Sequence, residues 1–186
     1  TDLKNFRKKK LIKNNQVVYH VENFRNSKIV KNLIENFLID NNSFVFESVE
    51  KGKIRGRYTI FGKNPDKIWE LKKNKVYLFK KQTRKIINKS PYIFLKQLVE
   101  EFKFKTPKNL PPICSLLAGF FSYDIIRYIE KIPNNCVDDL NLPDVRILRP
   151  TSLIIHDNVK KKIFYIVNCY FDEKIDDYQS KLKKIK

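Results

Sequence analysis

The fold is decided by the stretch SFVFESVEKGKIRGRYTIFG, which occupies residues 43–62. Two runs rich in β-branched and aromatic residues flank Lys51, Gly52 and Lys53, and this pattern predicts a β-hairpin. The stretch holds three of the four glycines in the chain. Where a sequence uses so few glycines, each one is expected to mark a positive φ angle, a bulge or a close approach of the backbone.

The first run of this hairpin carries the triplet Phe46-Glu47-Ser48. Alternation along the run gives it two mostly apolar faces, which predicts a strand covered on both sides inside a layered fold. A buried Glu47 would need a partner, because an unpaired carboxylate is costly to bury. Arg55 and Arg57 on the returning strand are the candidates.

Length and composition bound the class of protein. The chain has 186 residues, of which 42% are hydrophobic, and this suits one substantial core and argues against disorder. No apolar run reaches the roughly 18 residues of a membrane span, and the basic N-terminal residues lack the apolar stretch of a signal peptide. We therefore expect a soluble, cytoplasmic protein in which residues 1–186 form a single domain.

The net charge of +19 raises the question of nucleic-acid binding. Of the 39 basic residues only 8 are arginines, and the lysines occur in every segment instead of forming one stripe with interleaved aromatic residues. This distribution is typical of a solvated surface. We expect no specific nucleic-acid partner and only weak, salt-sensitive association with polyanions.

Local motifs for catalysis or metal binding are missing from the sequence. There is no Gly-rich phosphate loop, no HExxH and no GxSxG. The three cysteines are odd in number and far apart, which indicates neither a disulfide framework nor a zinc site. His20 and His156 lie in strand-like runs and are expected to be surface or packing residues. We expect no catalytic residue and no metal ligand in this segment.

Hydrophobic periodicity predicts the remaining elements, and their sum is an α+β fold. We expect mostly antiparallel sheets built from hairpins, with about seven strands and three or four packing helices. The predicted elements are an edge strand over residues 16–21, a helix from Asn26 or Ser27 to Leu38, a hairpin over residues 67–80 turning at Lys73-Asn74, a helix capped by Ser90 with Pro91 in its first turn, a buried strand passing into a helix over residues 114–130, a hairpin of residues 152–156 and 162–170, and a last helix capped by Asp172.

Three stretches, in order, resemble one known family. Residues 43–62 match a Ser-Phe-Leu-Leu-Glu-Ser run, a Gly-containing turn, and Gly-Arg-Tyr-Ser followed by an aliphatic pair and Gly. Residues 111–130 (PPICSLLAGFFSYDIIRYIE) are similar to a Pro-Pro, Gly-rich, Gly-Tyr-Asp and Arg-Tyr-Phe-Glu segment, with Ser115, Leu116 and Ser122 at usual glycine positions. Residues 142–168 (LPDVRILRPTSLIIHDNVKKKIFYIVN) are similar to a Leu-Pro-Asp strand and an Asp-His hairpin. The family is anthranilate synthase component I, a chorismate-utilising enzyme.

The resemblance implies the N-terminal, regulatory domain of a larger lyase subunit of tryptophan biosynthesis. In that family the enzyme makes anthranilate and pyruvate from chorismate and ammonia. The C-terminal domain binds chorismate and Mg²⁺ and holds the catalytic residues, and a glutamine amidotransferase subunit, component II, supplies ammonia. The helical pattern of this chain stops at Lys186 without a Gly or Pro, so we expect the catalytic domain to be missing. The segment alone should not catalyse the reaction.

The resemblance also implies a regulatory site. In the family L-tryptophan binds between the two domains and touches a Leu-Glu-Ser triplet, which corresponds here to Phe46-Glu47-Ser48. The chemistry fits, because Ser48 and strand-edge carbonyls can hold the zwitterion, Glu47 can face the ammonium group and Phe46 can pack on the indole. The simpler interpretation is that Glu47 and Ser48 only satisfy polar groups of their own hairpin.

Two other functions stay open at this point. Aminodeoxychorismate synthase component I, of the folate pathway, shares this domain and can carry a similar triplet. The chain can also be a non-enzymatic basic binding module. A gene that stops directly after Lys186 would favour the second alternative.

Overall fold

The computed structural model describes residues 14–24, 27–47, 56–104, 106–133, 135, 137–171 and 178–185. The chain divides into two compact units. The first unit consists of Thr1–Pro65, Phe104–Leu116 and Pro150–Lys186, and the second of Asp66–Lys103 and Leu117–Arg149. Two long strands contribute residues to both units, since the boundaries fall inside β3 and β7.

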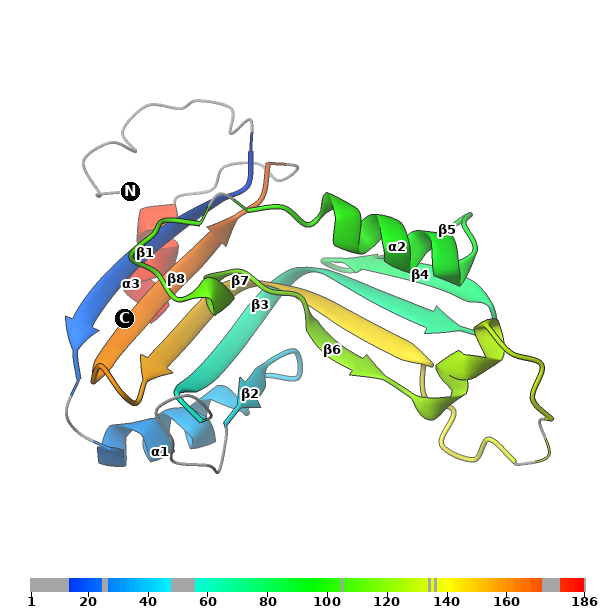
Figure 1. Ribbon diagram of the computed structural model, residues 1–186, viewed down its shortest axis with the longest axis horizontal. Coiled ribbons are helices and arrows are strands. Elements are labelled where there is room, and N and C mark those ends of the chain that lie inside the picture. Colours follow the sequence, from blue (N-terminus) through cyan, green and yellow to red (C-terminus); the bar gives the residue numbers. More distant parts are fainter. Residues whose placement is uncertain are drawn as a thin grey trace. The chain divides into compact units, whose positions relative to one another are not determined.

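Eight strands and three α-helices make up the described part of the fold (Figure 1). Every strand pair with a resolved register is antiparallel, so the predicted α+β class with antiparallel hairpins is confirmed. In chain order the elements are β1 (Gln16–Asn23), α1 (Ser27–Phe37), β2 (Phe44–Phe46), β3 (Tyr58–Lys72), β4 (Lys75–Lys80), β5 (Thr83–Ile87), α2 (Pro91–Glu101), a 3₁₀ turn (Pro112–Cys114), β6 (Ala118–Phe121), a 3₁₀ helix (Tyr123–Tyr128), β7 (Val145–Asp157), β8 (Lys162–Cys169) and α3 (Tyr178–Ile185).

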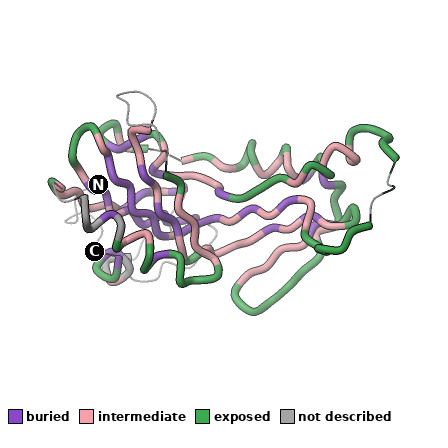
Figure 2. Tube along the Cα trace, turned by 90° about the horizontal axis from the view of Figure 1, so that it is seen from below, coloured by how far each residue is buried: buried purple, intermediate pink, exposed green. Residues whose placement is uncertain are grey.

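The first unit contains a sheet with both faces covered. β8 pairs with β1 on one side and with β7 on the other, and β2 pairs with the beginning of β3. One face packs against the segment Phe104–Leu116, through Leu110 and Cys114. The other face packs against α1 and α3. Because side chains alternate between two covered faces, consecutive residues of β7 and β8 are both apolar and buried. Figure 2 shows the buried residues gathered in the strands of this unit.

The second unit is built around the β3–β4–β5 strands and α2. Ser90 caps α2 by accepting a hydrogen bond from the amide of Ile93 at 3.4 Å, and Pro91 stands in the first turn. Phe94 on this helix packs into a cluster with Trp69 and Leu71 of β3 and further strand residues. β6 pairs with the first residues of β7, from Ala118 opposite Leu148 to Phe121 opposite Val145.

Several predicted elements are confirmed. The run at residues 16–21 is edge strand β1, and the hairpin at residues 67–80 turns at Lys73 and Asn74, which have φ angles of 48° and 60°. Two positive φ angles suit the tight turn of a two-residue hairpin. The last hairpin is β7–β8. Asp172, the predicted cap of the last helix, and Lys51-Gly52-Lys53, the predicted turn of the first hairpin, lie outside the described residues.

Other expectations are wrong. Residues 58–72 form one continuous strand, β3. The sequence predicted two strands here, the second strand of a hairpin ending at residue 62 and the first strand of a hairpin beginning at residue 67. The stretch expected as a buried strand and helix forms the short β6, with Phe120 and Phe121 exposed, and a 3₁₀ helix. Leu38 and Val99 were assigned to buried helix stripes but are 54% and 70% exposed, because neither is covered by a neighbouring element. β5 was missed, since its exposed, basic residues show no apolar alternation.

Candidate functional site

The candidate site lies on β2, the three-residue strand that begins the stretch at residues 43–62. Phe44 lies opposite Gly62, Val45 opposite Phe61 and Phe46 opposite Ile60 of β3. Phe61 is fully buried, whereas all three residues of β2 are partly or largely exposed. The expectation that this strand is covered on both sides holds for Phe44 and Val45, which pack against core clusters on opposite faces, and it fails at Phe46, which is exposed. β2 pairs with one strand and stands outside the main strand order.

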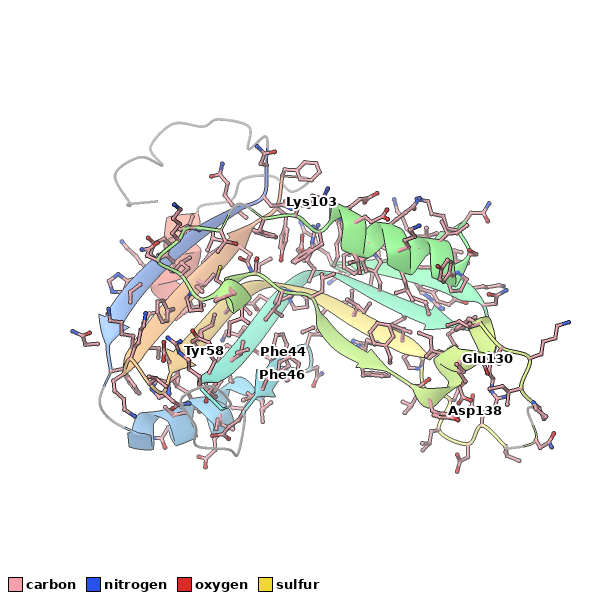
Figure 3. All side chains as sticks on the ribbon, viewed as in Figure 1. Phe44, Phe46, Tyr58, Lys103, Glu130 and Asp138 are labelled. Carbon is pink, nitrogen blue, oxygen red and sulfur yellow. The ribbon has the colours of Figure 1, made fainter. Side chains whose placement is uncertain are left out.

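Gly62 explains how the aromatic residues of β2 are arranged. The ring of Phe44 lies directly over Gly62, so that any side chain at this position would collide with the ring. This is the close approach of the backbone that the scarcity of glycine predicted. The rings of Phe44 and Phe46 are tilted against each other with their centroids 4.9 Å apart, and both are labelled in Figure 3.

The triplet Phe46-Glu47-Ser48 is described in part. Phe46 is 47% exposed and Glu47 is exposed, whereas Ser48 lies outside the described residues. Glu47 was expected to be buried and paired with Arg55 or Arg57. No described side chain pairs with Glu47, and because Glu47 itself is exposed to solvent its carboxylate needs no partner. Arg55 is likewise outside the described residues.

Arg57 instead binds Asp157, at the turn between β7 and β8. The guanidinium Nε donates to Asp157 Oδ1 at 3.1 Å and Nη2 donates to Oδ2 at 2.7 Å, which is a two-pronged contact. Asp157 is 1% exposed and also accepts hydrogen bonds from the amides of Val159 and Lys160, at 3.0 and 2.9 Å. Burial by itself would raise the pKa of Asp157, but the hydrogen bonds from Arg57 and these amides outweigh burial and lower its pKa.

Backbone contacts reinforce this ion pair. The amide of Asn158 donates to the carbonyl of Arg57 at 2.8 Å, and the Asn158 side chain reaches the carbonyl of Gly56 at 3.4 Å. Gly56 has a φ of 71°, a conformation that favours glycine. Sequence reasoning missed Asp157 and Asn158 as partners of Arg57, because their polarity was already explained by a hairpin turn.

The two histidines differ in their surroundings. His20 lies on β1, and its Nε2 is 2.9 Å from a carboxylate oxygen of Glu22. His156 is 5% exposed, packs edge-on against Phe24 with ring centroids 5.2 Å apart, and has no hydrogen-bond partner for Nδ1 among the described residues. Burial and the charge of Lys161 lower the pKa of His156, against the opposing effect of Asp157. Its place in the packed sheet suits the predicted packing role.

The two later stretches of family resemblance meet in the second unit. Tyr128 donates a hydrogen bond to Asp144 at 2.6 Å, and the amide of Ser122 donates to the Asp144 carbonyl at 2.8 Å. Burial and the bond to Asp144 raise the pKa of Tyr128 to about 12. The hydroxyl of Ser122, at a usual glycine position, is buried without a partner among the described residues. These contacts join the two motifs, and none of them forms a catalytic arrangement.

Two further observations concern metals and membranes. Among the described residues, no three His, Cys, Asp or Glu side chains gather closely enough to hold a metal ion. Cys114 and Cys169 are buried thiols, and Cys136 lies outside the described residues. Within the same part of the chain, no helix has the length and the apolar character that crossing a membrane requires.

Comparisons with known proteins identify relatives of the chain. It is 36% identical over 126 residues to anthranilate synthase component 1 of Cereibacter sphaeroides, an alignment that covers 65% of this chain and 25% of that protein. It is 34% identical over 145 residues to anthranilate synthase component 1 of Acetivibrio thermocellus, covering 77% of this chain and 29% of the relative. The chain therefore spans little more than a quarter of the length of these relatives.

A solved structure agrees at the level of the fold. Anthranilate synthase component I from Streptococcus pneumoniae superposes with a TM-score of 0.59 at 23% identity, over 74% of this chain and 30% of that one. No family model matches the chain. Fold and relatives together define an α+β chain that is similar to about a quarter of the length of anthranilate synthase subunits. More particularly, the chain belongs to the family of anthranilate synthase component I.

Proposed function

We propose that this chain is the N-terminal, tryptophan-sensing part of an anthranilate synthase component I. The observation that carries the proposal is the identity of 36% and 34% to proteins of that name. The extent of the match supports a partial chain, because it covers 25% and 29% of those relatives. The activity of the whole protein would be the conversion of chorismate and ammonia into anthranilate and pyruvate.

The geometry of β2 supports a role in effector binding. Phe46 presents a half-exposed aromatic ring beside Phe44, and Glu47 presents a carboxylate that no described cation neutralises. An exposed aromatic ring and an exposed acceptor at the same end of a strand suit a zwitterion with an aromatic side chain, such as L-tryptophan. Ser48 follows directly and completes the triplet as the third effector contact.

The catalytic chemistry would take place outside residues 1–186. By the family resemblance, chorismate, Mg²⁺ and the catalytic residues belong to the C-terminal domain, which also completes the effector pocket. A glutamine amidotransferase subunit would supply ammonia, and the assembled enzyme would work in the cytoplasm. The part played by this segment is regulatory: effector binding at β2 would favour a less active arrangement of the catalytic domain.

The decisive experiment measures tryptophan inhibition in the full-length protein that contains this chain. Anthranilate formation is followed against L-tryptophan concentration for the wild type, Ser48→Ala and Ser48→Phe, each relative to its own uninhibited rate. Losing one hydrogen bond to the charged effector should raise the half-inhibiting concentration by about tenfold or more. Ser48→Phe should have the larger effect, because its ring also occupies the space of the ligand.

Ser43 offers a matched control in the same stretch. Its hydroxyl donates to the carbonyl of Asp40 at 2.7 Å and is therefore already engaged in the turn that precedes β2. Ser43→Ala should therefore leave inhibition unchanged. Equal inhibition of wild type and both Ser48 variants would refute the assignment of Ser48. Formation of aminodeoxychorismate in place of anthranilate would move the chain to the folate-pathway alternative.

A further inference from the structure

We infer that Arg57 is a positioning residue for the exposed end of β2, Phe46 together with the following Glu47, which we call the effector face, and that it acts through Asp157. The inference rests on the proposed function, because it concerns regulation at the same site. Arg57 makes no described contact with Phe46 or Glu47. Its influence would pass along the beginning of β3, to which β2 is hydrogen-bonded.

The first step concerns Asp157, whose side chain is held in one position by burial and hydrogen bonds. Its side chain is 1% exposed and accepts hydrogen bonds from both prongs of the Arg57 guanidinium and from two backbone amides of the β7–β8 turn. The turn itself joins two strands paired from Ser152 opposite Val167 to Asp157 opposite Lys162. A carboxylate held by four donors at the end of a packed hairpin leaves little freedom to the group that binds it.

The second step is that Arg57 fixes the beginning of β3. Besides the ion pair, its carbonyl accepts from the amide of Asn158, and its guanidinium lies over the ring of Tyr58, 4.8 Å from the ring centroid. The next residue, Thr59, is 2% exposed, and its hydroxyl lies 3.5 Å from the Asn158 side-chain nitrogen. Residues 57–59 are thereby tied to the β7–β8 turn by side chain and backbone.

The third step leads to the effector face. Ile60 follows directly and is the partner of Phe46, at the end of a ladder only three residue pairs long. So short an edge strand takes its position from the strand that it pairs with. If Arg57 released Asp157, the first residues of β3 would lose their tie, and Phe46 and Glu47 would no longer be held in one place for a ligand.

The test uses the full-length protein, with anthranilate formation followed against L-tryptophan. Arg57→Gln removes the charge and the fork, and should raise the half-inhibiting concentration by at least about fivefold. Asp157→Asn should also raise the half-inhibiting concentration. It keeps the shape of the side chain and one acceptor for the turn amides, so it is the variant to measure if Arg57→Gln does not fold. Arg57→Lys keeps the charge without the fork, and should restore inhibition in part.

A matched control separates positioning from plain stability. Arg149 binds Asp66 in the second unit, also with two guanidinium nitrogens, and their side chains are 10% and 11% exposed. Arg149→Gln should lower the thermal midpoint as Arg57→Gln does, but leave the half-inhibiting concentration of tryptophan unchanged. If Arg149→Gln and Arg57→Gln raise the half-inhibiting concentration equally, the inference is overturned and the proposed function is not. The same holds if neither Arg57→Gln nor Asp157→Asn changes this concentration while the wild type is inhibited. A wild-type enzyme that tryptophan does not inhibit would overturn it together with the regulatory function.

Discussion

At the scale of single residues, the glycines of the stretch at residues 43–62 show how a rare residue type is used. Gly56 adopts a positive φ angle where the chain arrives at the β7–β8 turn, and Gly62 admits the ring of Phe44 over the backbone of β3. Each glycine meets a different steric need. Gly62 lies in the β2–β3 pair that carries Phe46, and Gly56 lies just before β3, beside the β7–β8 turn.

His156 is the residue whose burial is hardest to reconcile with its chemistry. Its ring is 5% exposed and its Nδ1 has no partner among the described residues, so that protonation would place a charge in the packed sheet near Lys161. A pKa below the ordinary value of 6.5 means that the folded chain binds a proton less readily than the unfolded chain. Stability must then fall as the pH drops.

We predict an acid-sensitive component of stability due to His156. It should be fully present above the unfolded pKa of about 6.5 and be lost as the pH falls from there towards the lowered pKa of the folded state. Urea unfolding of the chain at pH 7.5 and at lower pH values measures it, and His156→Leu should flatten the slope in this window. The pKa of Asp157 is also lowered, so its contribution to stability is lost only at pH values below its ordinary pKa of 3.8, outside this window. An unchanged slope in His156→Leu would contradict the prediction.

At the scale of elements, α3 shows how a short helix is held against the sheet of the first unit. Leu182 and Ile185 of α3 are 5% and 8% exposed, and pack against Val18, Val167 and Cys169 of β1 and β8. The described part of the helix has eight residues, and a helix of this length is not stable by itself in water. Among the described side chains of α3, these two attach the helix to the sheet.

We predict that Leu182→Ala destabilises the chain by about 2–5 kcal/mol, the usual cost of removing a buried leucine side chain. Lys183 is the next residue, exposed on the same helix, so Lys183→Ala provides the control and should change stability by less than about 0.5 kcal/mol. Urea unfolding measures both variants. Similar values for the two would show that α3 does not need its apolar face to stay on the sheet.

At the scale of the whole molecule, the two basic residue types are used differently: arginines form ion pairs, and lysines supply surface charge. Of the five arginines in the described part of the chain, four make ion pairs with carboxylates: Arg57, Arg127, Arg146 and Arg149. The planar fork of arginine suits such partly buried pairs, whereas most lysines are suited to the solvated surface. The net charge of +19 therefore comes mainly from lysines spread over the sequence. This distribution favours a general attraction to polyanions over a specific interface.

We predict that association with nucleic acid is weak and lost with salt. Filter binding of labelled DNA should show retention at low ionic strength and none near about 150 mM salt, because the attraction depends on the release of counterions. A random-sequence DNA serves as the control for specificity. Retention of one sequence over another at about 150 mM would instead support the basic binding module.

The sequence alone determined the types of the main elements. The 3.6-residue period gave α1 and α2, Ser90 and Pro91 marked where α2 begins, and Lys73-Asn74 marked the turn between β3 and β4. The three stretches of resemblance also pointed to the family through their residues alone. All of these signals act between residues that are close in the chain, which is why they can be read without tertiary structure.

Tertiary structure decided which distant residues meet. The sequence offered Arg57 as a partner for Glu47, ten residues away, and the fold paired it with Asp157, 100 residues away. Likewise, the apolar pattern of β2 suggested a covered strand, and its position beside β3 left Phe46 and Glu47 exposed. Burial and ion pairing depend on which strands become neighbours and in what register, and this is fixed by packing over the whole unit and not by the local run of residues.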